Sequence, residues 1–166
     1  MKRVYLILAC LCLLAFAVMP AQAFTAKSLT VTLAPNGDAQ INMQYDLNFL
    51  EKSAVFFRMA DPATEVKKAF ASNTGREVTV NSVTDSSADI VVPSYAGVTR
   101  NNGATTLTTP AISFLRAQEV LKRYWFAPLV SANFAPQVTT ITFPDGYQET
   151  FINSLSMPAV SHTMSV

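Results

Sequence analysis

The 166-residue chain has little of several residue types on which protein chemistry commonly depends. It contains one histidine, two cysteines and five glycines, and only 14% of its residues are charged. Both cysteines, Cys10 and Cys12, lie within the first 23 residues. Residues 24–166 therefore contain no thiol for a disulfide, and one histidine is too few for the usual zinc ligand sets. We therefore expect no metal site.

Charge of either sign is also scarce. The chain has 12 basic and 11 acidic residues and no long block of like charges of the kind that stays disordered. This balance excludes the polybasic surface with which proteins bind nucleic acids. The sequence also contains neither a Gly-x-x-x-x-Gly-Lys phosphate loop nor a Gly-x-Gly-x-x-Gly turn, so we expect no nucleotide cofactor.

The first 23 residues have the pattern of a cleaved signal peptide. Lys2 and Arg3 precede an uncharged apolar run over 4–19, and the small residues Ala21 and Ala23 follow it. We expect cleavage after Ala23. An uncleaved anchor and a lipoprotein modified at Cys10 are the alternatives. No second apolar run of spanning length follows, so we expect no membrane span after signal removal and a secreted or extracytoplasmic location.

Residues 24–166 are expected to form a single globular domain that contains three β-hairpins. Hydrophobic and polar residues alternate on both sides of Asn36-Gly37, a dipeptide typical of hairpin turns. A similar pattern predicts strands at 77–84 and 88–93. Pro144-Asp145-Gly146 predicts a turn between strands at 137–143 and 147–152.

Two or three helices are expected between the hairpins. The spacing of apolar residues favours a helix over 48–59, although a strand also fits there. Asp61-Pro62 is typical of a helix start, and Gly75 would end that helix. A third helix is predicted over 114–126. Residues 99–106 are interpreted as a mobile surface loop, and 153–166 as an edge strand or a loosely held end.

These elements predict an α+β fold, an antiparallel sheet built from about three hairpins with two or three helices packed on one face. Serine and threonine are abundant after residue 23. Both residue types suit the exposed face of such a sheet better than any chemistry.

Candidate catalytic residues are few. His162 lies four residues from the C-terminus, where a surface histidine is expected rather than a member of a catalytic triad. Asp145 and Glu149 flank a predicted turn and are interpreted as turn residues rather than paired catalytic acids. We therefore predict no catalytic, cofactor-binding or metal-binding residue.

One segment could contact a partner. Arg116, Lys122 and Arg123 form a basic edge beside Trp125 on the predicted third helix. Such an edge can hold an acidic partner or lie on an anionic membrane, but Glu119 interrupts it, and a solvated helix face is the favoured interpretation. We note these four residues as a possible partner contact.

The sequence favours a non-enzymatic exported domain. We expect it to act by contact with cell-envelope components or by self-association. The alternative is a small extracellular carboxylate-dependent hydrolase or a binder of a small ligand, which would need an acid of raised pKa in a concave site.

Overall fold

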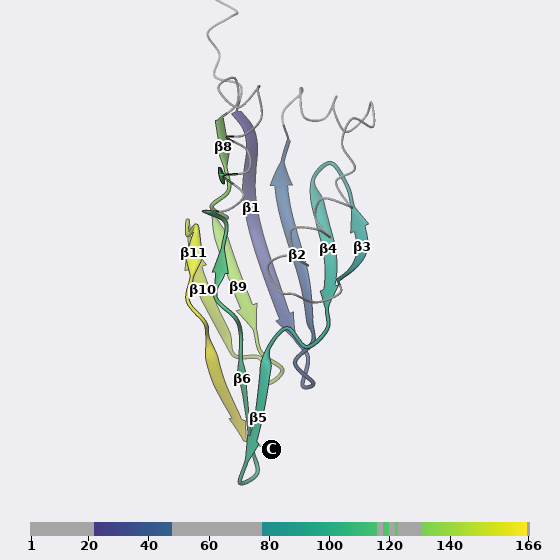
Figure 1. Cartoon of the computed structure of the whole chain (residues 1–166), viewed down its shortest axis with the longest axis vertical. Helices are drawn as coiled ribbons and strands as arrows, with labels where there is room; N and C mark the ends of the chain where they lie inside the picture. The colour runs from purple at the N-terminus through teal and green to yellow at the C-terminus, as the bar shows by residue number, and fades with distance from the viewer. Residues whose placement is uncertain (1–21, 48–77, 116–117, 120–121, 123–130, 166) are drawn as a thin grey trace, which may run out of the picture.

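The computed structural model describes residues 22–47, 78–115, 118–119, 122 and 131–165, and these residues form a seven-stranded sheet, a three-stranded sheet that faces it and a two-stranded pair (Figure 1). The strands of the main sheet are β1 (Gln22–Leu33), β2 (Ala39–Asp46), β3 (Thr79–Val83), β4 (Ser87–Val92), β8 (Ser131–Asn133), β9 (Val138–Thr142) and β10 (Gln148–Ile152). The remaining strands are β5 (Gly97–Asn101), β6 (Ala104–Thr108), β7 (Ile112–Ser113), β11 (Ser156–Met157) and β12 (Ser161–Ser165).

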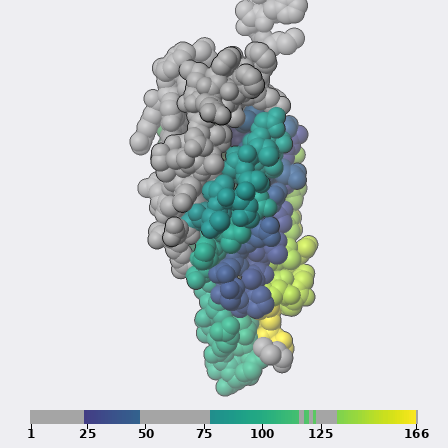
Figure 2. All heavy atoms as spheres, turned by 90° about the vertical axis from the view of Figure 1, so that its right-hand side faces the viewer, coloured from purple at the N-terminus to yellow at the C-terminus, as the bar shows by residue number. Residues whose placement is uncertain are grey.

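The main sheet has the strand order β10-β9-β1-β2-β4-β3, with β8 beside the start of β1. Its pairs are antiparallel except where β1 meets β8 and β9, which run parallel to it. All three predicted hairpins are confirmed, as β1–β2, β3–β4 and β9–β10. The strands run along the length of an elongated body, which Figure 2 shows from the β3 side.

The second sheet has the order β12-β6-β5, and the separate two-stranded pair β7–β11 follows along the same two chain segments. The ladders β6–β12 and β7–β11 share one register, with three residues of each strand between them. Pro110 and Pro158 lie in this gap, and proline cannot donate to a ladder. Thr109 bridges it, because its N–H donates to the Val160 carbonyl at 2.8 Å and its Oγ1 accepts from the Val160 N–H at 3.0 Å.

The predicted α+β class is wrong. The face of the main sheet that was expected to carry helices packs instead against the second sheet. Leu107 of β6 is fully buried in one cluster with Val31, Ile41 and Ile141 of the main sheet. In the described part of the chain, helical hydrogen bonding is confined to Gln118 N–Phe114 O and Lys122 N–Gln118 O, at 3.4 and 3.2 Å.

The interpretation of 99–106 as a loop is also wrong, because β5 and β6 form a fourth hairpin there. Asn102 and Gly103 both have positive φ, 48° and 79°, which is the backbone of a tight hairpin turn. The polar residues around that turn alternate with Val98 and Leu107 and so fit a sheet with one wet face. The tail prediction is confirmed, since β12 is an edge strand. The predicted helices over 48–59 and 61–75 lie outside the described residues.

Candidate functional site

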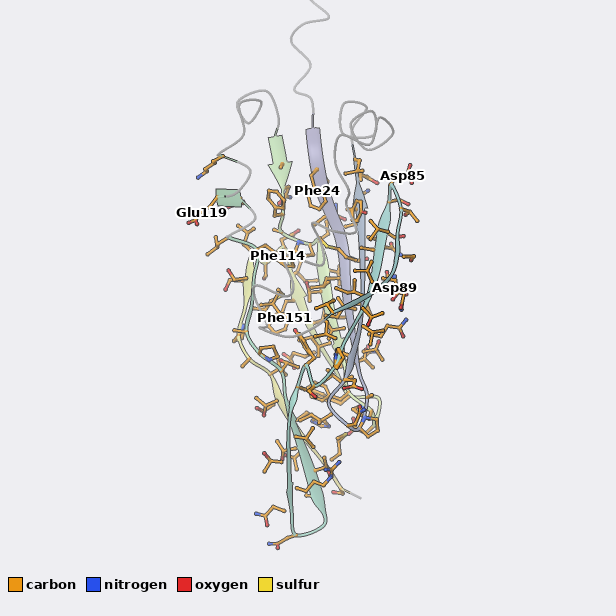
Figure 3. The ribbon with its side chains drawn as sticks, turned by 45° about the vertical axis from the view of Figure 1, so that its right-hand side comes forward. Phe24, Asp85, Asp89, Phe114, Glu119 and Phe151 are labelled. Carbon is orange, nitrogen blue, oxygen red and sulfur yellow. The ribbon has the colours of Figure 1, made fainter. Side chains whose placement is uncertain are left out.

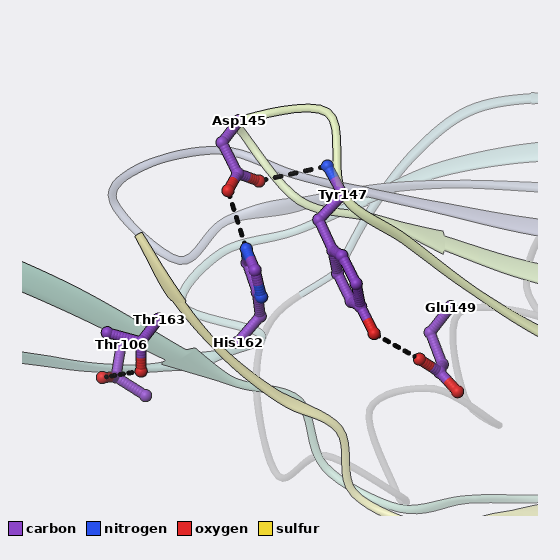
Figure 4. Close-up of polar contacts among 6 residues, drawn as sticks. All are labelled: Thr106, Asp145, Tyr147, Glu149, His162 and Thr163. Atoms are coloured by element: carbon purple, nitrogen blue, oxygen red, sulfur yellow. Dashed lines mark hydrogen bonds and ion pairs between the residues drawn. The ribbon is translucent and has the colours of Figure 1, made fainter. Parts of the chain in front are cut away.

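Four polar side chains meet where the two sheets approach each other at one side of the molecule. Asp145 and Tyr147 belong to the connection between β9 and β10, Glu149 to β10, and His162 to β12 (Figure 4). We call Asp145, Tyr147, Glu149 and His162 the flank cluster. His162 Nε2 lies 2.7 Å from Asp145 Oδ2, and Tyr147 donates its hydroxyl to Glu149 Oε2 at 2.7 Å.

The turn holds Asp145 in place for this contact. Gly146 has φ of 90°, and the Tyr147 N–H donates to Asp145 Oδ1 at 3.1 Å. The other oxygen, Oδ2, is thereby directed to His162. That hydrogen bond is the main cause that lowers the pKa of Asp145, because it favours the ionised carboxylate. The prediction that Asp145 is a turn residue is confirmed.

The His162 ring is packed between aromatic rings. It stacks on Tyr147 with ring centres 4.1 Å apart and planes 8° apart, and its edge contacts Phe143 at 5.1 Å. Phe143 is buried in the core, whereas the His162 side chain is 22% exposed. The hydrogen bond to Glu149 raises the pKa of Tyr147, because it favours the protonated phenol. The cluster therefore joins the C-terminal strand to the main sheet.

The flank cluster lacks a partner for nucleophilic catalysis among the described residues. The hydroxyl residues beside His162 in sequence, Ser161 and Thr163, point to the opposite face of the strand. There they pair with Thr108 and Thr106, each at 2.8 Å. An Asp–His pair orients an imidazole, but a hydrolase of the triad type also needs a hydroxyl on that ring.

A second feature covers the outward face of the main sheet, on three neighbouring strands. Thr150, Thr140 and Thr30 lie opposite one another on β10, β9 and β1, and Gln148, Thr142 and Thr32 form the next row. We call Thr30, Thr32, Thr140, Thr142 and Thr150 the threonine face. All five are half-buried or exposed. The two rows continue on β2 as Asn42 and Gln40.

The hydroxyls of the threonine face are free. Within the described part of the chain, none of the five donates to or accepts from another protein group. On the second sheet, by contrast, four of the outward hydroxyls satisfy one another in the pairs Thr106–Thr163 and Thr108–Ser161. Cross-strand hydrogen bonds between hydroxyls are one way in which threonine stabilises a sheet. The threonine face therefore keeps its hydrogen-bonding capacity for other molecules.

Charge is nearly absent from these two rows. The ionisable side chain that continues the first row is Asp89 on β4, the strand on the other side of β2 from β1; Figure 3 labels it together with Asp85. Its two carboxylate oxygens accept hydrogen bonds from Gln40 Nε2 at 3.2 Å and from Asn81 Nδ2 at 3.1 Å. The face is thus uncharged over β10, β9 and β1.

The predicted partner-contact segment is only partly described. Lys122 is exposed, while Arg116, Arg123 and Trp125 lie outside the described residues, as do residues 1–21 with Ala21. Ala23 lies in β1, so cleavage after it would remove the first two residues of that strand.

Across the described ranges, no three acidic, histidine or cysteine residues are grouped as metal ligands would be. Those ranges also hold no helix long and apolar enough to cross a bilayer.

Comparisons with known proteins found no matching family model, no similar curated protein and no similar solved structure.

Proposed function

We propose that the chain is an exported, non-enzymatic domain that binds a component of the cell envelope through its threonine face. Removal of residues 1–23 would free the domain outside the cytoplasmic membrane. The observation that carries the proposal is the set of aligned, unpaired hydroxyls on β1, β9 and β10. Hydroxyl groups that form no hydrogen bond within the protein can form hydrogen bonds with a partner.

The direction of the acid pKa values also supports contact over catalysis. An acid of raised pKa in a concave site would favour the hydrolase alternative. Asp38 and Asp145 instead have lowered pKa values, through hydrogen bonds from Ser94 and with His162 respectively. Both carboxylates hold turns in place, which is a structural role.

Co-sedimentation of the exported chain with purified cell envelopes tests the proposal. The double variant Thr32→Lys/Thr150→Lys places two charges on the threonine face, on strands separated by β9. Its matched control, Thr99→Lys/Thr163→Lys, places two charges on the outward face of the second sheet, on strands separated by β6. All four threonines are exposed, so both variants are expected to fold.

We expect the wild-type chain and the control to sediment with envelopes and the face variant to remain in solution. Equal sedimentation of both variants would contradict the proposal. Self-association is distinguished by sedimentation velocity without envelopes, where a dimer that only the face variant abolishes would make a second copy the partner. The hydrolase alternative would require turnover that Asp145→Asn and His162→Gln both abolish.

A further inference from the structure

We infer that the ligand of the threonine face is an uncharged polysaccharide chain lying across the strands. This inference rests on the proposed function and names the chemical class of its partner. The rows Thr150-Thr140-Thr30 and Gln148-Thr142-Thr32 repeat across strands that lie about 4.8 Å apart, and the two rows are about 6.7 Å apart along the strands. A sugar polymer likewise presents hydroxyl groups at a regular repeat along its length.

The charge of the face favours a neutral ligand. A nucleic acid or an acidic polysaccharide needs cations, and the two rows contain none. A basic ligand would need an open carboxylate, whereas both oxygens of Asp89 already accept hydrogen bonds from Gln40 and Asn81. Further along β1 and β2, Lys27 and Asp46 neutralise each other at 2.8 Å.

The face also offers apolar contact of the kind that a sugar ring can use. Each threonine places a methyl group beside its hydroxyl. Ile152 and Val138, opposite each other in the next row, are 60% and 39% exposed. Sugars expose both C–H surfaces and hydroxyl groups, so this mixture matches them. Protein interfaces instead concentrate aromatic residues in their centres, and these rows hold none.

Native gel electrophoresis through dissolved dextran, mannan or β-glucan tests the inference, with alginate as the anionic comparison. The variant Thr30→Val/Thr140→Val removes two hydroxyls that lie directly opposite each other but keeps the methyl groups and the β propensity. The control Thr106→Val/Thr163→Val removes the hydroxyls that bond to each other on the second sheet.

We expect at least one neutral polysaccharide to retard the wild-type chain and the control, and alginate to retard neither. The face variant is expected to bind about tenfold more weakly, because two ordinary hydrogen bonds are lost. Absence of retardation by all three neutral polysaccharides would overturn the inference, as would retardation by alginate alone or equal weakening in the control. Envelope binding that still depends on Thr32 and Thr150 would then leave the proposed function standing with another ligand.

Discussion

His162 Nε2 lies 2.7 Å from Asp145 Oδ2, and this contact joins the last strand of one sheet to the β9–β10 turn of the other. The stack of His162 on Tyr147 supports the same connection. The flank cluster therefore connects the two sheets at one side of the molecule. Because the only histidine of the sequence lies in it, the cluster can be followed by a single imidazole signal.

The flank contact makes stability depend on pH in the acid range. The hydrogen bond from His162 lowers the pKa of Asp145 below its usual value, so the folded state binds this proton less tightly than the unfolded chain does. The contact stabilises the fold above the unfolded pKa of about 3.9. That stabilisation is lost as the pH falls through the lower folded value.

Urea unfolding between about pH 6 and pH 2 measures this dependence, across the ordinary pKa of aspartate. The wild-type chain is expected to lose more stability on acidification than Asp145→Asn, which has no carboxylate to protonate. Asp38→Asn provides a comparison, because hydrogen bonds from Ser94 and Asn36 also lower the pKa of Asp38. Identical pH profiles for the wild-type chain and Asp145→Asn would show that the flank contact does not contribute.

Gly37 is predicted to be the least replaceable glycine of the described turns. Its φ is 86°, and a Cβ there would lie 2.5 Å from the Ala96 carbonyl oxygen. Gly146 has a similar φ of 90° but open space around it. We expect Gly37→Ala to destabilise the fold by about 3 kcal/mol and Gly146→Ala by about 1 kcal/mol, since only the first adds a clash to backbone strain. Thermal unfolding of both variants checks this order, and equal losses would contradict it.

Thr139 carries a buried hydroxyl that bonds to no protein group in the described part of the chain. The residue is 1% exposed and faces the core from β9. Thr139→Val is expected to raise the free energy of unfolding by about 1 kcal/mol, because it removes an unsatisfied polar atom at nearly constant volume. The neighbouring exposed variant Thr140→Val serves as the control and is expected to change stability by less than about 0.5 kcal/mol. A destabilised Thr139→Val would indicate a partner for that hydroxyl.

The sequence predicted the elements that local signals specify. Asn36-Gly37 and Pro144-Asp145-Gly146 mark turns, and alternating residues on either side mark the strands that pair. Asn102-Gly103 carries the same signal, but the polar composition of 99–106 hid it. Because threonine fills outward positions of this hairpin, few hydrophobic residues remain to reveal an alternating pattern.

Long-range pairing is what the sequence did not reveal. His162 meets Asp145 only because β12 pairs with β6 and the sheets face each other, which no short motif encodes. The threonine face likewise depends on β9 lying parallel to β1, so that Thr140 and Thr142 fall opposite Thr30 and Thr32. The abundance of threonine was apparent from composition, whereas its alignment in rows required the register.

The central claim, that the threonine face is the contact surface, is tested most directly by NMR of the chain with ¹³C-labelled threonine methyl groups. Purified envelope fragments are added, and each methyl signal is followed. We predict that Thr30, Thr32, Thr140, Thr142 and Thr150 lose intensity while Thr106, Thr108 and Thr163 of the second sheet do not. Loss confined to the second sheet, or loss shared equally by both, would contradict the claim.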